Sequence, residues 1–269
     1  MINIQNYVRP QSLEEAYQLN QKRQNRIIGG MLWLKMSSLS VHTAIDLCDL
    51  GLDRIEENQE QFSIGAMATL RQIEQHEGLN RYSGGKIAAA VKDIVGVQFR
   101  NLATVGGSIW GRFGFSDVLT IFLSMDSYVE LYKGGILPLE QFASQKADRD
   151  ILLRLIVKKT PGRFTYRAMR NQRGDFPVLA CAVSRLNGEY RAVAGARPGK
   201  ALLLRDEKKL LSDGITEASA QAFADSFAEL VPTGSNLRGS AAYRTHLIRV
   251  LCTRNLLELG GNDDHGNQA

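Results

Sequence analysis

The 269-residue sequence has few residues that could bind a metal. Its three cysteines lie far apart in apolar stretches, and no two of them form a CxxC pair: Cys48, Cys181 and Cys252. This pattern argues against a zinc or iron–sulfur site built from this chain alone. The four histidines are widely spaced as well, and we interpret them as surface or core residues. We therefore predict no metal site, and the scattered cysteines indicate a cytoplasmic location.

Long apolar runs and blocks of basic residues are also missing. No run reaches the roughly 18 apolar residues that a membrane helix needs, and the N-terminal "MINIQNYVRP" lacks the apolar centre of a signal peptide. The net charge is +5, but Lys and Arg alternate with Asp and Glu along the chain. We therefore expect neither a membrane nor a nucleic acid as partner.

Two common phosphate-binding motifs are absent. "GARPGKA" at 195–201 has the wrong spacing for a P-loop and lacks the Ser or Thr that binds magnesium. No strand pattern leads into GxGxxG, so a Rossmann dinucleotide fold is unsupported.

The sequence does contain clear helix and turn signals. Ser12 with Glu15, and Thr69 with Gln72, have the spacing of helix capping boxes, and Ser116 is placed to cap an apolar helix. Asn187-Gly188 between two apolar runs predicts a tight hairpin. Strands and helices follow one another without a regular βαβ rhythm, which favours an α+β fold, and Pro161-Gly162 indicates a boundary.

Two glycine pairs follow β-branched residues, in "IIGGM" (27–31) and "TVGGS" (104–108). A strand that ends in two glycines can turn consecutive backbone N–H groups toward one point, where they could hold a pyrophosphate. The alternative is that each pair is only a tight turn.

Five motifs together resemble the FAD-binding subunit of the molybdenum hydroxylases, the group of xanthine dehydrogenase and carbon monoxide dehydrogenase. In chain order they are "RPQSLEEAYQL", "RIIGGM", "IGAMATL", "VGVQFRNLATVGGSI" and "LRGSAAYRTHLIRVLCTRNLLE". The resemblance runs nearly from end to end.

The resemblance implies a two-lobed FAD-binding domain of the molybdenum-hydroxylase (PCMH-like) type, followed by a small C-terminal α/β domain. We expect the FAD-binding domain at 1–162, with an N-terminal lobe at about 1–57 and a central lobe at about 58–162. We expect the C-terminal domain at 163–262 and a disordered tail at 263–269.

The resemblance also implies the cofactor-binding residues, since FAD would lie between the two lobes. Backbone amides of the first loop and of the second glycine segment would hold the pyrophosphate, Asp117 would bond the ribityl or phosphate region, and Phe176 would lie against the flavin ring. The full set is Ile27, Ile28, Gly29, Gly30, Met31, Leu32, Trp33, Ile94, Gly96, Thr104, Val105, Gly106, Gly107, Ser108, Asp117 and Phe176.

The implied function is electron transfer within a multi-subunit enzyme. Electrons from the [2Fe–2S] clusters of an iron–sulfur subunit would pass through FAD here to NAD+ or another acceptor. A molybdopterin-containing large subunit would hydroxylate the substrate, for which a purine is the commonest guess. The flavin would supply the redox chemistry, so we nominate no catalytic side chain.

The sequence departs from the family pattern in both loops. Met31 and Leu32 stand where the family has polar residues, Ser108 replaces an Asn, and "WGRFGF" (110–115) introduces Arg112. These departures leave open a flavin-free scaffold or assembly subunit as an alternative. A carbohydrate-acting oxidase of the related flavin fold is a further one, although the C-terminal motif favours the hydroxylase branch.

Overall fold

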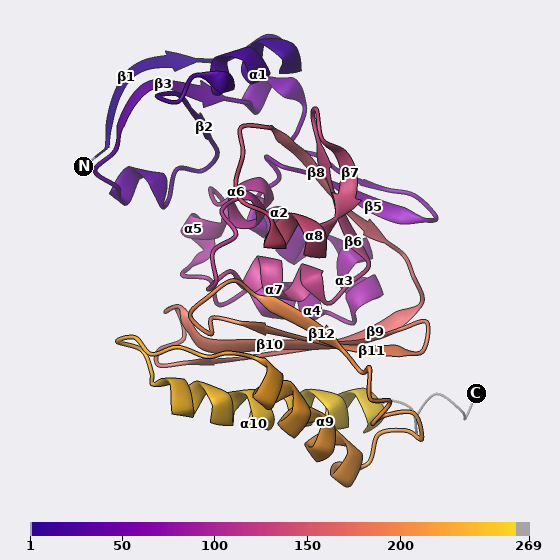
Figure 1. Cartoon of the computed structure of the whole chain (residues 1–269). Coiled ribbons are helices and arrows are strands. Elements are labelled where there is room, and N and C mark those ends of the chain that lie inside the picture. Colours follow the sequence, from indigo (N-terminus) through magenta and orange to yellow (C-terminus); the bar gives the residue numbers. More distant parts are fainter. Residues whose placement is uncertain (1, 262–269) are drawn as a thin grey trace.

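The computed structural model describes residues 2–261, so the tail predicted at 263–269 lies outside the described residues. The N-terminal lobe is a three-stranded parallel sheet in the order β1-β3-β2, covered by helix α1 (Figure 1). Its elements are β1 (Asn3–Val8), α1 (Leu13–Gln21), β2 (Arg26–Ile28), the 3₁₀ turn η1 (Leu34–Met36), β3 (Ser40–Asp46) and η2 (Cys48–Leu50).

The central lobe is built on a five-stranded antiparallel sheet in the order β4-β5-β8-β6-β7. The strands are β4 (Ile55–Glu57), β5 (Gln61–Gly65), β6 (Ser127–Leu131), β7 (Gly135–Pro138) and β8 (Leu152–Lys158). The helices are α2 (Leu70–Gln75), α3 (Glu77–Ser83), α4 (Lys86–Val91), α5 (Val97–Arg100), α6 (Val105–Trp110), α7 (Asp117–Leu123) and α8 (Leu139–Ser144).

The C-terminal part is a four-stranded antiparallel meander with two long helices on one face (Figure 1). Its elements are β9 (Gly162–Arg170), β10 (Pro177–Leu186), β11 (Glu189–Gly195), β12 (Leu202–Arg205), α9 (Glu217–Leu230) and α10 (Ala241–Gly261). Arg244 of α10 is fully buried and donates to the carbonyls of Val178, Gly234 and Gly239 and to the Asn236 side chain. One side chain thus ties the helix to the sheet and to the loop before α10.

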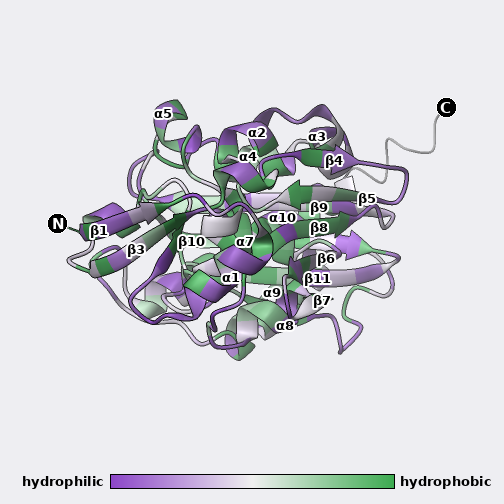
Figure 2. Ribbon diagram, turned by 90° about the horizontal axis from the view of Figure 1, so that it is seen from above, coloured by the Kyte–Doolittle hydropathy of each residue, from purple (hydrophilic) through white to green (hydrophobic). Residues whose placement is uncertain are grey.

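Helices α4 and α7 fill the space between the central sheet and the C-terminal sheet. They pack against β9, β10 and β11, and every residue of α7 is buried. Figure 2 shows the hydrophobic residues gathered on the strands and helices in the middle of the molecule, with a largely hydrophilic β1 at the edge. The burial of α7 places Asp117, its first residue, inside the protein.

Several of the local predictions are confirmed. The Ser12 and Ser116 side chains cap α1 and α7, and Thr69 with Gln72 forms a reciprocal capping box at α2. Asn187 and Gly188 have φ of +47° and +87°, and they join β10 to β11 as the tight hairpin turn. The mixed α+β architecture is also as predicted. Between residues 2 and 261, no helix has the length and apolarity to span a membrane.

The prediction that a strand ends at 104–108 is wrong. Thr104 is the extended N-cap of α6, and its side-chain oxygen accepts a hydrogen bond of 3.1 Å from the Gly107 amide. Gly106 and Gly107 therefore lie in the first turn of a helix. A β-branched Thr-Val pair fits an N-cap followed by a first helical residue as well as it fits a strand.

Candidate cofactor site

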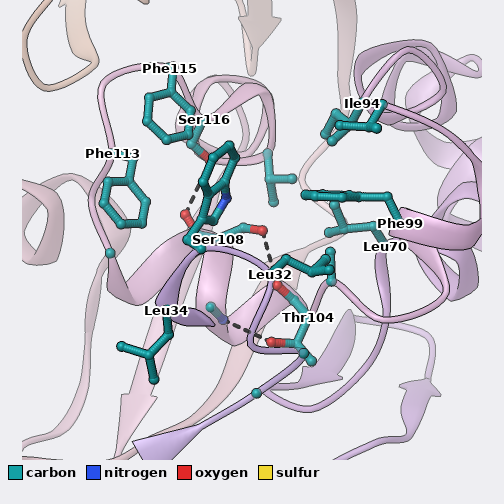
Figure 3. Close-up of a pocket in the computed structure, with 18 of the residues that line it drawn as sticks. Leu32, Leu34, Leu70, Ile94, Phe99, Thr104, Ser108, Phe113, Phe115 and Ser116 are labelled. Carbon is teal, nitrogen blue, oxygen red and sulfur yellow. Dashed lines mark hydrogen bonds between the residues drawn. The ribbon is translucent and has the colours of Figure 1, made fainter. Parts of the chain in front are cut away.

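A large cavity, of about 550 Å³, opens between the three parts of the fold. Its walls come from the loop after β2, from α5, α6 and the loop before α7, and from the loop between β9 and β10. Figure 3 shows Phe113 and Phe115 on one side and Leu70, Ile94 and Phe99 on the other. The lining is dominated by apolar and aromatic side chains, as is typical of a site for a planar organic ligand.

The first glycine loop, which lines this cavity, contains backbone amides without a hydrogen-bond partner among the described residues. Ile27 to Trp33 all line it, and the amides of Gly30, Met31, Leu32 and Trp33 donate to no acceptor within the described chain. Gly30 lies very close to the segment that precedes α6. A Cβ atom on Gly30 would be 1.8 Å from the carbonyl oxygen of Leu102. Consecutive unpaired N–H groups beside glycines suit an anion. Such amides need an acceptor once a ligand excludes water from them, and an anion can accept from several at once.

The second glycine segment differs from the prediction, since its amides are already used. The amides of Val105 and Gly106 donate to Ala68 and Ala66, and those of Gly107 and Ser108 donate to Thr104. Thr104, Gly107 and Ser108 line the large cavity, whereas Gly106 lines only a second, smaller cavity and Val105 lines neither. The segment thus contributes hydrogen-bonded hydroxyl groups and a glycine to the cavity wall, and it offers no second set of free amides (Figure 3).

Ile94, Asp117 and Phe176 line the cavity as well, whereas Gly96 does not. Asp117 is 4% exposed, pairs with the Arg170 guanidinium at 2.8 Å and accepts a hydrogen bond from the Tyr166 hydroxyl. Burial raises the pKa of the Asp117 carboxyl, while the hydrogen bonds and charge of its two partners oppose that shift. Asp117 therefore links the central lobe to β9 in addition to lining the cavity.

Strained backbone lies around the same cavity. Met31 and Val95 line it with φ of +57° and +51°, and Arg112, between lining residues Gly111 and Phe113, has φ of +46°. Positive φ is costly for a side chain with a Cβ, above all for a β-branched valine, and such strain is concentrated at functional sites. Arg112 itself is buried, with its guanidinium 3.7 Å from the Phe142 ring centroid, so its charge does not enter the cavity.

Sequence reasoning missed most of the aromatic lining. Phe99, Phe113 and Phe115 surround Trp33 and Phe176, with Phe113 and Phe115 stacked at 5.1 Å. The available signal was the "WGRFGF" stretch, whose three aromatic residues stand out in a chain with 7% aromatics. Their grouping with Phe99 depends on the tertiary fold.

A second cavity of about 420 Å³ was also missed. It shares Ile27, Ile28, Gly29, Thr104, Gly107 and Trp110 with the first cavity, so the two meet at the glycine loop. Arg26 and Arg149 line it, and both donate only to backbone carbonyls, with no carboxylate partner among the described residues. Asp148 and Asp150 lie on the same wall, where the Asp150 carboxylate accepts from the amides of Lys133 and Gly134.

The arrangement suits binding rather than acid–base chemistry by the protein. Residues 2–261 hold no group of three His, Cys, Asp or Glu side chains placed to bind a metal. The combined site offers an aromatic cavity for a planar ring, free amides for an anion, and a second cavity with two arginines. These features fit a dinucleotide with a flavin ring at one end, because the pyrophosphate between its two halves would meet the amides.

Two known domain families match this chain. The family described as the FAD binding domain in molybdopterin dehydrogenase matches residues 2–159, and the CO dehydrogenase flavoprotein C-terminal domain matches residues 164–259. The chain is 28% identical to the uncharacterized protein YgfM of Escherichia coli K12, over 92% of this chain and 93% of that protein.

Two better-described relatives extend the comparison. The nicotine 6-hydroxylase medium subunit of Paenarthrobacter nicotinovorans is 26% identical, over 94% of this chain and 96% of its own. Carbon monoxide dehydrogenase from Hydrogenophaga pseudoflava superposes with a TM-score of 0.83 at 22% identity, which covers 96% of this chain and 97% of that one and shows a shared fold. The chain therefore belongs to the family of FAD-binding medium subunits of the molybdenum hydroxylases.

Proposed function

We propose that this chain is the electron-transfer subunit of a molybdenum hydroxylase, in which electrons from the [2Fe–2S] clusters of a partner subunit pass through FAD to NAD+ or another acceptor. The observation that carries this proposal is the row of unpaired amides from Gly30 to Trp33, which opens onto an aromatic cavity. Bound FAD would supply the redox chemistry, because a flavin exchanges electrons singly or in pairs.

Each part of the site has a proposed task. The aromatic cavity would hold the flavin ring and exclude water from it. The amides of the first loop, together with Gly29, Thr104 and Gly107 where the cavities meet, would hold the pyrophosphate. Arg26 and Arg149 would stabilise the negative charge of the phosphates from the second cavity, which would take the adenosine half.

The proposed partners rest on the family to which the chain belongs. The three cysteines do not form a cluster site, since Cys48 is exposed while Cys181 and Cys252 are buried elsewhere. We propose that an iron–sulfur subunit supplies the electrons and that a molybdopterin-containing large subunit hydroxylates the substrate. We also propose a cytoplasmic complex and a boundary near residue 162 between the FAD-binding and C-terminal domains, where β8 ends and β9 begins.

Flavin content tests the proposal. The purified full chain, alone and co-purified with its partners, should be yellow and release FAD on denaturation. The stripped protein should take up FAD in preference to FMN and riboflavin, because only FAD reaches the second cavity. A colourless chain that takes up no FAD, even in the complex, would refute the proposal and support the flavin-free scaffold.

A further inference from the structure

Trp33 lines the aromatic cavity and packs against three other aromatic side chains. Its ring centroid lies 5.0 Å from that of Phe176, 5.4 Å from Phe115 and 6.2 Å from Phe99. These three partners come from the β9–β10 loop, the loop before α7 and α5, so one indole contacts three of the other walls. Aromatic pairs at such separations are stabilising, and they fix the position of the indole.

The ring of Phe176 is already covered by the protein itself. Trp33 lies against it at an interplanar angle of 30°, Phe115 approaches it edge-on at 4.4 Å, and the Arg238 guanidinium carbon lies over it at 4.7 Å. Arg238 is held there by Asp175, whose carboxylate it contacts at 2.8 Å. Trp33, Phe115 and Arg238 thus already take up contacts of the Phe176 ring that a planar ligand would need.

Trp33 keeps a free surface and sits on a well-defined loop. It remains 38% exposed while it lines the cavity. The loop is fixed by the close approach of Gly30 to Leu102 and by hydrogen bonds of 3.0 Å from Lys35 to Met31 and 3.1 Å from Met36 to Trp33. The same loop also carries the unpaired amides, so the indole and the anion site keep a constant spacing.

We propose that Trp33 is the side chain on which the flavin ring stacks, and that Phe176 and Phe115 act through it by holding the indole in place. This inference rests on the proposed function. The stacking contribution belongs to the ring alone, so it should be equal for riboflavin, FMN and FAD. The amides of the loop and the arginines of the second cavity would then distinguish these ligands by their phosphates.

The test uses the fact that the sequence contains only two tryptophans. In full-length Trp110→Phe, Trp33 is the sole indole, and titration of the stripped protein with FAD or riboflavin should quench its emission. Trp33→Ala should weaken the binding of FAD and riboflavin by the same factor, about tenfold, as aromatic stacking on a base commonly provides. Trp33→Phe should keep most of the affinity, and Met36→Ala, an exposed neighbour outside the cavity lining, should leave both affinities unchanged.

The outcomes separate this inference from the proposed function. Equal or tighter binding of both flavins by Trp33→Ala would overturn it, because Trp33 would then only fill the cavity. Unchanged Trp33 emission in flavin-loaded Trp110→Phe would overturn it as well, and this measurement leaves Trp33 in place. Failure of the unmodified protein to bind any flavin would instead refute the proposed function, and the stacking role with it.

Discussion

Gly30→Ala offers the sharpest test of the first glycine loop. Gly30 does not have positive φ, so an alanine is not strained there by its own backbone. Its Cβ atom, however, would lie 1.8 Å from the Leu102 carbonyl oxygen and 2.5 Å from the Leu102 carbonyl carbon. Ordinary contact begins near 3.4 Å, so the loop would have to move away by about 1.6 Å.

The magnitude follows from what this movement disrupts. A shift of that size removes the amides of Gly30 and Met31 from hydrogen-bond range of any anion they hold together with Thr104. A hydrogen bond to a charged group contributes about 1.5–3 kcal/mol, so the loss of one weakens FAD binding by about 10- to 100-fold and the loss of two by about 100- to 10,000-fold. Overpacking should also lower the free energy of unfolding by about 1–3 kcal/mol.

The assay is titration of the stripped protein with FAD, followed by flavin fluorescence, beside a urea unfolding curve of the same sample. Gly51→Ala is the matched control: Gly51 has φ of +67° and open space around it, so alanine there costs about 1–2 kcal/mol without touching the cavity. If Gly30→Ala binds FAD as tightly as the unmodified protein, the loop does not hold the cofactor and the reasoning fails.

Further predictions concern the buried polar contacts. Asp117→Asn leaves the Arg170 guanidinium without its carboxylate, and should lower the free energy of unfolding, measured in urea, by about 3–5 kcal/mol. The double variant Asp117→Asn with Arg170→Met should recover part of this lost stability. If the losses from the two single substitutions simply add in the double variant, the two side chains do not act as a pair. Arg244→Met removes four hydrogen bonds from a buried site and should lower the free energy of unfolding by at least about 3 kcal/mol. A decrease below about 1 kcal/mol would show that these bonds contribute little to stability. Tyr82 donates to the Lys158 and Thr160 carbonyls, and burial raises its pKa above 10, so its contribution to stability is complete below pH 10 and is lost as the pH rises toward its folded pKa. Above pH 10, the midpoint temperature of thermal unfolding should therefore fall more steeply with pH for the unmodified protein than for Tyr82→Phe. If the two midpoints fall in parallel, Tyr82 does not make this contribution.

The local signals of the sequence were sufficient for much of the fold. Thr69 with Gln72, Ser116, and Asn187-Gly188 each specify a cap or a turn through contacts within a few residues, and the structure has them as predicted. The segment at 104–108 was mistaken for a strand end because Thr-Val also suits an N-cap. Only the pairing of the Thr104 oxygen with the Gly107 amide resolves that choice.

The candidate site was predicted less completely, because its parts meet only in the folded chain. Arg26 and Arg149 line one cavity from positions 123 residues apart, and no spacing rule connects them. The resemblance led to the glycine loops but not to the difference between them, in which one has free amides and the other has none. That difference depends on where Ala66 and Ala68 of the central lobe lie, which sequence patterns do not specify.

The position of the large cavity at the junction of three parts of the fold also concerns assembly. The cavity exists only when the N-terminal loop, α6 with α7, and the β9–β10 loop are docked together. A ligand that binds only this docked arrangement stabilises it by a free energy that grows with the logarithm of the ligand concentration over the dissociation constant. FAD uptake would then report completed docking of the subunit, and a chain with normal secondary structure but loosened lobes would be identified by its missing flavin.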